Sequence, residues 1–320
     1  MKKITLIILI LTLTIYIFAA GNLESKSEET SITVAFLPII DALPLYIAES
    51  QGYFLEENLK VKALSVANPI ERDRLMQSGE IDGMLNELST LALFNRDSTN
   101  LKAVITVRKP MYGSPYFRIL ASPKSGISSP KDLANIPIAV SKNTVIEYLT
   151  ERILQAEGIP TDSIKTKNVP VIPERYQLLM SGALPAATLP DPLAEAAIAA
   201  GAILITDDLT YPEYSVSVLS FTADLIDNNP QIVERFIRAW NRAVKDLNSD
   251  PETFRKLFLE KIRVPESIEK TFRIPEFPYQ EIPSQKQWDD VINWLQEKEL
   301  IETSPLYEPS ITETFISIND

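Results

Sequence analysis

Residues 136–154, IPIAVSKNTVIEYLTERIL, decide the fold because they read as a strand, a polar loop and a helix in immediate succession. Ile138–Val140 is an apolar run long enough for a buried strand. Thr144 opens a T-V-I-E sequence that matches a capping box, in which the threonine and the glutamate satisfy free amides at a helix start. Gly158 predicts the end of the helix. A helix that starts directly after a strand points backbone N–H groups into a crevice, where a small anion or polar group can bind.

The chain contains a second copy of this arrangement. Arg72–Met84, RDRLMQSGEIDGM, aligns without gaps on Arg175–Ala187, RYQLLMSGALPAA, so that an arginine, a leucine and a Ser-Gly pair coincide. Upstream of each copy, a strand, a loop and a helix that ends in glycine follow one another. Thr144 taken alone is also typical of an ordinary helix cap, but the shared order of elements indicates a duplicated unit. Alternating strands and helices in each unit predict a mostly parallel sheet flanked by helices.

The first 21 residues have the form of a secretory signal peptide. Two lysines precede the apolar stretch Ile4–Phe18, and small residues follow around Ala20–Gly21, where we expect cleavage. An uncleaved membrane anchor is the alternative, because the apolar stretch approaches the ~17 residues that can span a bilayer. The chain has no cysteine, which excludes a lipid-modified cysteine as an anchor. We therefore expect an extracytoplasmic protein, either periplasmic, secreted or at the cell surface.

The composition excludes several classes of function. The 320 residues carry a formal net charge of −12 and include no histidine and no cysteine. An acidic chain argues against nucleic acid as a partner. Without histidine and cysteine, the common zinc sites and the Ser-His-Asp and Cys-His nucleophilic sites cannot form. Neither a GxxxxGK[ST] phosphate loop nor a GxGxxG motif is present. We therefore predict no enzymatic activity, no cofactor and no metal site.

The division of the chain follows from changes in composition along it. PKSGISSP, residues 123–130, is rich in turn-forming residues and reads as a crossover between lobes. Beyond Pro230 the chain is mainly helical, with aromatic residues at the spacing of core-packing helices, and we expect it to return to the first lobe. The predicted parts are a signal peptide at 1–21, a polar tether at 22–31, a first lobe at 32–123 and 222–320, and a second lobe at 124–221.

Five stretches carry a resemblance to a known family. They are FLPIIDALPLYIAESQGYF, RDRLMQSGEIDG, PKSGISSPKDL, IAVSKNTVIEYL and LPDPLAEAAIAAGA. Together, from about Ile32 to Trp240, they resemble the extracytoplasmic substrate-binding proteins of ABC importers, in the nitrate/sulfonate/taurine and thiamine-pyrimidine-like branch. The resemblance implies a two-lobed α/β clamshell of the type II periplasmic-binding-protein class, with the ligand between the lobes. It also implies a permease and its ATPase as partners. We expect a monomer that meets the membrane only through the permease or an uncleaved signal anchor.

The resemblance also implies positions for ligand-binding residues at strand ends and helix starts of both lobes. These positions are Phe36, Asp41, Asn86, Glu87, Arg108, Tyr112, Ser141, Asn143, Thr144, Asp191 and Tyr214. Tyr112 and Tyr214 are the candidates for stacking on a ring. The three carboxylates favour an amine or an aminopyrimidine over a simple anion. The structural alternatives are helix capping for Asp41 and Asp191, and core packing for Phe36.

The predicted function is solute binding without chemistry. A ligand that bridges the helix starts of both lobes would shift an open–closed equilibrium toward the closed form, which docks on the permease. The ligand is expected to be a small polar organic molecule, either an amine, an aminopyrimidine or a sulfonate-like compound. One alternative is a ligand-binding sensor module for a membrane partner. Another is an enzyme of the pyrimidine-synthesis type, which would require the histidine and metal chemistry that this chain lacks.

Overall fold

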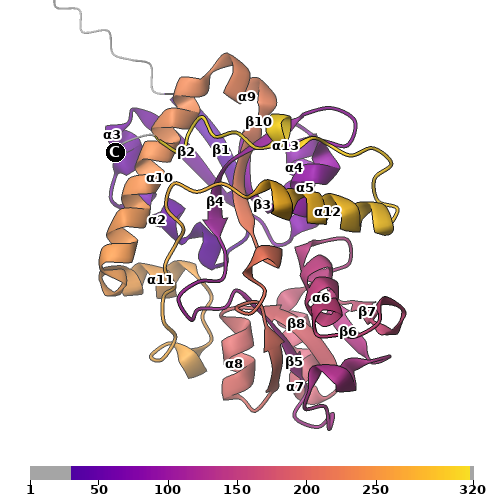
Figure 1. Ribbon diagram of the computed structural model, residues 1–320. Coiled ribbons are helices and arrows are strands. Elements are labelled where there is room, and N and C mark those ends of the chain that lie inside the picture. The colour runs from indigo at the N-terminus through magenta and orange to yellow at the C-terminus, as the bar shows by residue number, and fades with distance from the viewer. Residues whose placement is uncertain (1–29, 318–320) are drawn as a thin grey trace, which may run out of the picture.

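The computed structural model describes residues 30–317, and two five-stranded sheets organise them into an upper and a lower lobe (Figure 1). The strand order of the first sheet is β2-β1-β3-β10-β4, and that of the second is β7-β6-β8-β5-β9. The strands are β1 (Thr30–Phe36), β2 (Leu59–Ser65), β3 (Gly83–Glu87), β4 (Leu101–Arg108), β5 (Phe117–Ala121), β6 (Pro137–Val140), β7 (Lys165–Asn168), β8 (Ala186–Pro190), β9 (Ile203–Asp207) and β10 (Ser217–Thr222).

The two sheets have the same topology. In each, the first three strands of the order pair in parallel, and the fourth runs antiparallel to both of its neighbours. That antiparallel strand is β10 in the first sheet and β5 in the second. The architecture is therefore a pair of α/β lobes, as the duplicated sequence pattern predicted, and their sheets have equivalent strand orders.

The helices cover both faces of the sheets and join the strands. The α-helices are α2 (Leu43–Ser50), α3 (Tyr53–Glu56), α4 (Pro69–Gln77), α5 (Leu88–Phe94), α6 (Val145–Ala156), α7 (Ile172–Ser181), α8 (Leu193–Ala199), α9 (Ala223–Asn228), α10 (Pro230–Ser249), α11 (Arg255–Lys261), α12 (Gln285–Glu297) and α13 (Tyr307–Ser310), and the 3-10 helices are η1 (Ile40–Ala42), η2 (Pro130–Leu133), η3 (Thr161–Ser163), η4 (Pro212–Tyr214), η5 (Pro251–Phe254) and η6 (Glu266–Ile268). Within residues 30–317, none of these helices is both long and apolar enough to cross a membrane.

The fold-deciding stretch forms the predicted strand, loop and helix, namely β6 and α6. Thr144 caps α6 by accepting a hydrogen bond from the Ile146 amide at 3.2 Å. The Glu147 carboxylate accepts from the Asn143 amide at 2.8 Å, one residue earlier than the capping box predicts. The helix ends at Ala156, just before the left-handed Gly158 (φ +86°). Local sequence therefore specifies both ends of this helix.

The two crossings between lobes do not lie where the sequence pattern placed them. The chain crosses at residues 109–116 and again at 208–216, because β5 already pairs in the second sheet and β10 in the first. The prolines and serines of residues 123–130 lie inside the second lobe, between β5 and β6. Which sheet a strand joins depends on partners far away in the sequence, and local composition does not carry that information. We therefore propose lobe boundaries of 30–108 and 217–317 for lobe 1, and 117–207 for lobe 2.

The N-terminal predictions lie mostly outside the described residues. The signal peptide at 1–21 and most of the tether at 22–31 fall in this part of the chain. Thr30 and Ser31, which we expected to end the tether, belong instead to β1, where they pair in parallel with Leu59 and Lys60 of β2.

The C-terminal region packs on lobe 1, as its aromatic spacing predicted. The buried apolar face of α10 includes Phe236 and Trp240 and packs on α2, α3 and the first sheet. Further on, α12 packs on α5, and the Thr312 amide after α13 donates to the Ala103 carbonyl of β4 at 3.0 Å.

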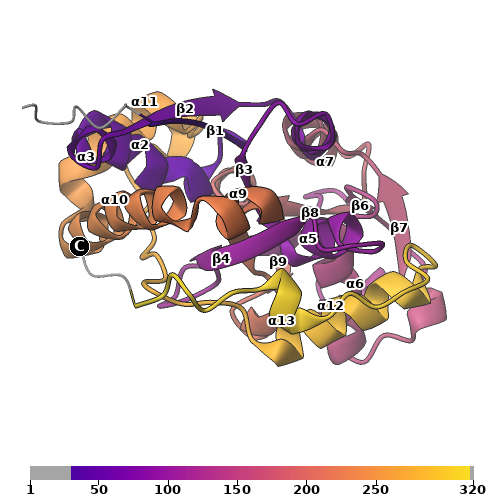
Figure 2. The same ribbon diagram turned by 90° about the horizontal axis from the view of Figure 1, so that it is seen from above.

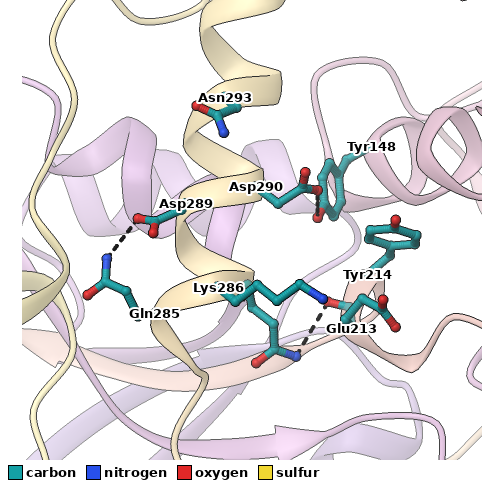
Figure 3. Close-up of a pocket in the computed structure, with 9 residues that line it drawn as sticks. Tyr148, Glu213, Tyr214, Gln285, Lys286, Asp289, Asp290 and Asn293 are labelled. Atoms are coloured by element: carbon teal, nitrogen blue, oxygen red, sulfur yellow. Dashed lines mark hydrogen bonds between the residues drawn. The ribbon is translucent and has the colours of Figure 1, made fainter.

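Helix α12 also binds lobe 2, through a set of contacts with α6 that we call the α6–α12 junction. Tyr148 and Arg152 of α6 both donate to the Asp290 carboxylate of α12, and Figure 3 shows Asp290 pointing at Tyr148. The junction comprises Tyr148 Oη–Asp290 Oδ2 at 2.6 Å, Arg152 Nε–Asp290 Oδ2 at 3.1 Å, Arg152 Nη1–Glu297 Oε2 at 3.1 Å, Trp294 Nε1–Glu151 Oε2 at 2.7 Å and Lys298 Nζ–Glu151 Oε1 at 2.6 Å. It adds a non-covalent link between the lobes to the two covalent crossings.

Candidate functional site

Two buried arginines occupy equivalent places in the two lobes. Arg72 of α4 donates through Nη1 to the Leu85 carbonyl of β3 at 3.0 Å, and Arg175 of α7 donates through Nη1 to the Thr188 carbonyl of β8 at 3.1 Å. Both side chains are fully buried. The aligned copies in the sequence therefore correspond to the same contact in space. Each arginine fixes the start of a helix beside the end of a strand, in the segments that border the space between the lobes.

The partners of these arginines differ between the lobes. Arg72 also forms an ion pair with Glu87 at 3.2 Å, so this predicted ligand-binding carboxylate already has a cationic partner. Arg175 instead donates to the Ser141 hydroxyl at 3.0 Å, and burial without an ion pair lowers its pKa to about 10. Both arginines coincide in the sequence repeat, but local sequence does not show that they hold Glu87 and Ser141.

A cavity of about 490 Å³, which we call the interlobe cleft, lies between the lobes. Its walls come from the segments after β1 and β2 in lobe 1 and the segments before α7 and after β8 in lobe 2. It is lined by Leu37, Pro38, Ile39, Ser65, Val66, Ala67, Asn68, Pro69, Pro170, Val171, Ile172, Pro173, Pro190, Asp191, Pro192, Leu193, Ile262 and Arg263. A cavity of this size with mainly apolar walls and a few polar groups is typical of small-molecule sites.

A polar cluster at the crossings brings three of the predicted residues near one another. The Tyr116 hydroxyl donates to Asp41 at 2.6 Å, and the Arg108 guanidinium lies 4.8 Å from the centre of the Tyr116 ring. Arg118 pairs with Asp191 at 2.9 Å. Burial raises the pKa of Asp41, and the positive charge of Arg108 opposes this shift. Asp41, Arg108 and Asp191 thus belong to one buried network that joins both lobes.

The structure shows which of the two carboxylates predicted as possible helix caps, Asp191 and Asp41, does cap a helix. Asp191 accepts a hydrogen bond from the Glu195 amide at 3.2 Å and so caps the start of α8, besides pairing with Arg118. Asp41 lies within η1 and makes no capping hydrogen bond to η1 or α2. Its carboxylate turns toward the crossing because Tyr116 supplies a buried donor there.

Tyr112 and Tyr214, the ring-stacking candidates, lie away from the interlobe cleft. Tyr112 is 78% exposed in the first crossing. Tyr214 borders a separate groove of about 460 Å³ beside α12, where its ring meets the Tyr148 ring edge-on with centroids 6.0 Å apart (Figure 3). The second crossing runs toward α12 before it enters β10, and this route carries Tyr214 away from the cleft.

The remaining predicted residues have structural partners outside the cleft lining. Phe36 is buried and packs edge-on against Tyr46 at 5.4 Å between ring centres. Asn86 accepts from the Ser220 hydroxyl within the first sheet at 2.8 Å. Asn143 is exposed at the start of α6, and Thr144 caps that helix. Among all the predicted positions, Asp191 alone is part of the cleft lining.

The buried network at the crossings also contains three residues that were not predicted from the sequence, namely Tyr116, Arg118 and Asp208. Asp208 is fully buried and accepts from the amides of Tyr116 and Phe117 at 2.9 and 2.8 Å, which ties the two crossings together. The sequence does distinguish Arg118, because it is the one charged residue in the apolar strand YFRILA. A charge at such a position is seldom buried without a partner.

The buried carboxylates predict a fall in stability with rising pH. Burial raises the pKa of Asp208 to about 7 and that of Asp191 to about 6, from an ordinary value of 3.8. Between these values the folded state holds more protons than the unfolded state, so the free energy of unfolding should decrease as the pH rises from about 5 to about 7. Urea unfolding at both pH values measures this slope. Asp208→Asn should flatten it, and an unchanged slope in that variant would contradict the prediction.

Solved structures with the same fold are mostly binding proteins. A ligand-binding component of an ABC-type import system from Staphylococcus aureus matches with a TM-score of 0.75 and 13% identity, over 91% of this chain and 99% of its own. The alkanesulfonate-binding protein SsuA from Xanthomonas axonopodis pv. citri, bound to MOPS, matches with a TM-score of 0.73 and 15% identity, over 89% and 99%. The aliphatic sulphonate binding protein SsuA from Escherichia coli gives 0.73 and 14%, over 88% and 93%. The chain therefore has the periplasmic-binding-protein fold.

The same fold also occurs in an enzyme. The desulfurization enzyme DszB matches with a TM-score of 0.64 and 14% identity, over 90% of this chain and 97% of its own. No curated protein matches the chain by sequence. The NMT1/THI5-like family model matches residues 40–254, which is more than half of the chain and includes most strands of both sheets. The chain is therefore a member of the NMT1/THI5-like family.

Proposed function

We propose that the protein is the extracytoplasmic solute-binding component of an ABC import system. It binds a small organic molecule in the interlobe cleft and delivers it to a permease. The observation that supports this most is the cleft itself, whose walls include equivalent segments of the two lobes, at the starts of α4 and α7. A ligand there contacts both lobes at once and so favours their closed arrangement.

The hydrogen-bond network supports a sulfonate-like ligand over an amine or aminopyrimidine. Each carboxylate that led us to expect a cationic ligand already has a donor within the protein. Glu87 pairs with Arg72, Asp191 with Arg118, and Asp41 accepts from Tyr116. A cationic ligand would have to compete with these buried contacts for the carboxylates. The sulfonate-binding proteins that share this fold are consistent with the same ligand class.

A binding role without catalysis is supported by the residue types present. The chain has no cysteine and no histidine, so it lacks the groups from which most nucleophilic and acid–base sites are built. A sensor module for a membrane partner is the second candidate. A neighbouring permease and ATPase gene would support import, whereas a neighbouring kinase or cyclase gene would support sensing. N-terminal sequencing of the exported protein tests the proposed signal cleavage near Ala20–Gly21.

The function can be tested by identifying molecules that co-purify with the protein and measuring how they stabilise it. Native mass spectrometry should detect a bound small molecule, and at ten times its dissociation constant that ligand should raise the free energy of unfolding by ~1.4 kcal/mol. Val171 is 48% exposed at the cleft, so Val171→Glu adds a charge to an apolar wall with little strain on the fold. This variant should weaken binding on the order of tenfold.

Leu204→Glu is the matched control for Val171→Glu. Leu204 is 43% exposed in β9 of the same lobe and does not line the cleft. The Leu204→Glu variant should leave the affinity for the ligand unchanged. Equal affinities for the two variants would argue against binding in the cleft, and turnover of a substrate by the pure protein would overturn the proposed function.

A further inference from the structure

Arg108 carries a buried guanidinium group that is incompletely satisfied within the described residues. Its side chain is 1% exposed, and its Nη2 atom donates to the Pro115 carbonyl at 3.3 Å. Its Nε and Nη1 atoms have no hydrogen-bond partner among the residues that the structure describes. The nearby carboxylates of Asp41 and Asp191 accept hydrogen bonds from Tyr116 and Arg118 instead, although one oxygen of Asp41 has no hydrogen-bond partner in the described part of the chain. A buried charge with unsatisfied N–H groups destabilises the folded protein unless a group of opposite charge contacts it.

A second buried arginine lines the same small cavity, which we call the hinge pocket. Arg118 is 8% exposed, and its Nη2 atom donates to Asp191 and Glu195 at 2.9 and 2.8 Å. Its Nε atom has no hydrogen-bond partner within residues 30–317. The hinge pocket has a volume of about 200 Å³ and is also bordered by Ser114, Thr271 and Arg273. Asp191 is the one residue that lines both this pocket and the interlobe cleft.

The composition of the hinge pocket suits an oxyanion. Three arginines face two carboxylates, and both carboxylates are already bound to one arginine, Arg118. Guanidinium N–H groups form short, charge-assisted hydrogen bonds with the oxygens of sulfate, phosphate, sulfonate and carboxylate groups. The Ser114 hydroxyl can donate to the same oxygens.

We propose that the hinge pocket binds an oxyanion. The oxyanion is either a free inorganic ion or the acid group of the solute in the cleft. The second source rests on the proposed function, because it requires a solute whose acid group extends past Asp191. Arg108, Thr271 and Arg273 belong to lobe 1, Ser114 to the first crossing, and Arg118 to lobe 2. A bound oxyanion therefore contacts both lobes at the crossing and holds them in this arrangement.

The test uses sulfate, phosphate and butanesulfonate as probes, with chloride to keep the ionic strength constant. Thermal unfolding and isothermal titration calorimetry should show saturable binding of at least one probe. Arg273 is exposed, so Arg273→Gln should keep the fold and weaken the binding of that probe on the order of tenfold. Arg108→Gln should abolish it. Arg74→Gln is the matched control, because Arg74 is exposed and lines neither the cleft nor the hinge pocket.

The probes distinguish the two sources of the oxyanion. Binding of sulfate or phosphate as tight as that of butanesulfonate supports a free ion. Binding of butanesulfonate alone, weakened by both Arg273→Gln and Val171→Glu, supports the acid group of a cleft solute. The inference is overturned if no probe binds saturably, or if the Arg273→Gln and Arg74→Gln variants bind the probe equally well. A natural ligand whose affinity depends on Val171 but not on Arg273 would overturn this inference and leave the proposed function intact.

Discussion

Replacing Arg72 with methionine is expected to lower the free energy of unfolding by about 3–5 kcal/mol, because it breaks a buried ion pair from one side. The guanidinium is fully buried and bonds the Leu85 carbonyl, Glu87 and Asp73. Methionine fills a similar volume but leaves the Glu87 carboxylate, 16% exposed, without its cation. Urea unfolding at neutral pH measures the loss.

Two further variants separate the buried charge from the lost packing. Adding Glu87→Gln to Arg72→Met removes the orphaned carboxylate and should restore part of the stability, so the two changes should not be additive. Arg96→Met is the matched control, because Arg96 also pairs with the next residue, Asp97, but both side chains are more than half exposed. It should change stability by less than about 1 kcal/mol. If Arg72→Met and Arg96→Met lowered the free energy of unfolding by similar amounts, burial of the ion pair would not determine its contribution to stability.

Replacing Asp290 with alanine is expected to cost about 2–4 kcal/mol and to loosen the α6–α12 junction. The carboxylate accepts from the Tyr148 hydroxyl at 2.6 Å and from Arg152 Nε at 3.1 Å. Tyr148 is 1% exposed, so its hydroxyl would be left buried without an acceptor. The side chain of Asp290 is itself 35% exposed, and Arg152 keeps Glu297, which holds the loss below that of a fully buried pair.

Asp289 provides the control for Asp290 within the same helix. Its carboxylate accepts from Gln285 of α12 at 2.7 Å and points away from Tyr148 (Figure 3). Asp289→Ala should change the free energy of unfolding by no more than about 0.5 kcal/mol. In small-angle X-ray scattering, Asp290→Ala should have the larger radius of gyration. Identical stability and size for the two variants would mean that the junction does not hold the lobes together.

The sequence predicted what depends on local patterns. The ends of α6 follow from Thr144 and Gly158, and the apolar face of α10 follows from its spacing. The duplication was visible because Arg72 and Arg175 make the same local contact. Each donates a hydrogen bond to the carbonyl of a strand residue thirteen positions further on, Leu85 and Thr188 respectively. Each of these features is specified within about twenty residues of sequence.

The sequence did not predict features that depend on distant partners. The sheet that β5 and β10 each join depends on pairing with β8 and β3, which lie far away in the sequence. The residues of the candidate site also have partners that lie far away in the sequence. Asp41 was identified, whereas its partner Tyr116 lies 75 residues away. Tyr214 was identified as an aromatic loop residue, but the direction of its ring depends on α12.

The position of the α6–α12 junction determines how the lobes can move. Figure 2 shows α6 and α12 along one side of the molecule and β2 and α7 along the other, where the cleft walls lie. With one side fastened, the lobes can separate only by rotation about that side, so the largest displacement falls at the cleft entrance. Ile70, next to the cleft residue Pro69, and Val171 stand exposed on opposite lobes there. Because the natural chain contains no thiol, a dye attached to a cysteine at either position would report this rotation without background labelling.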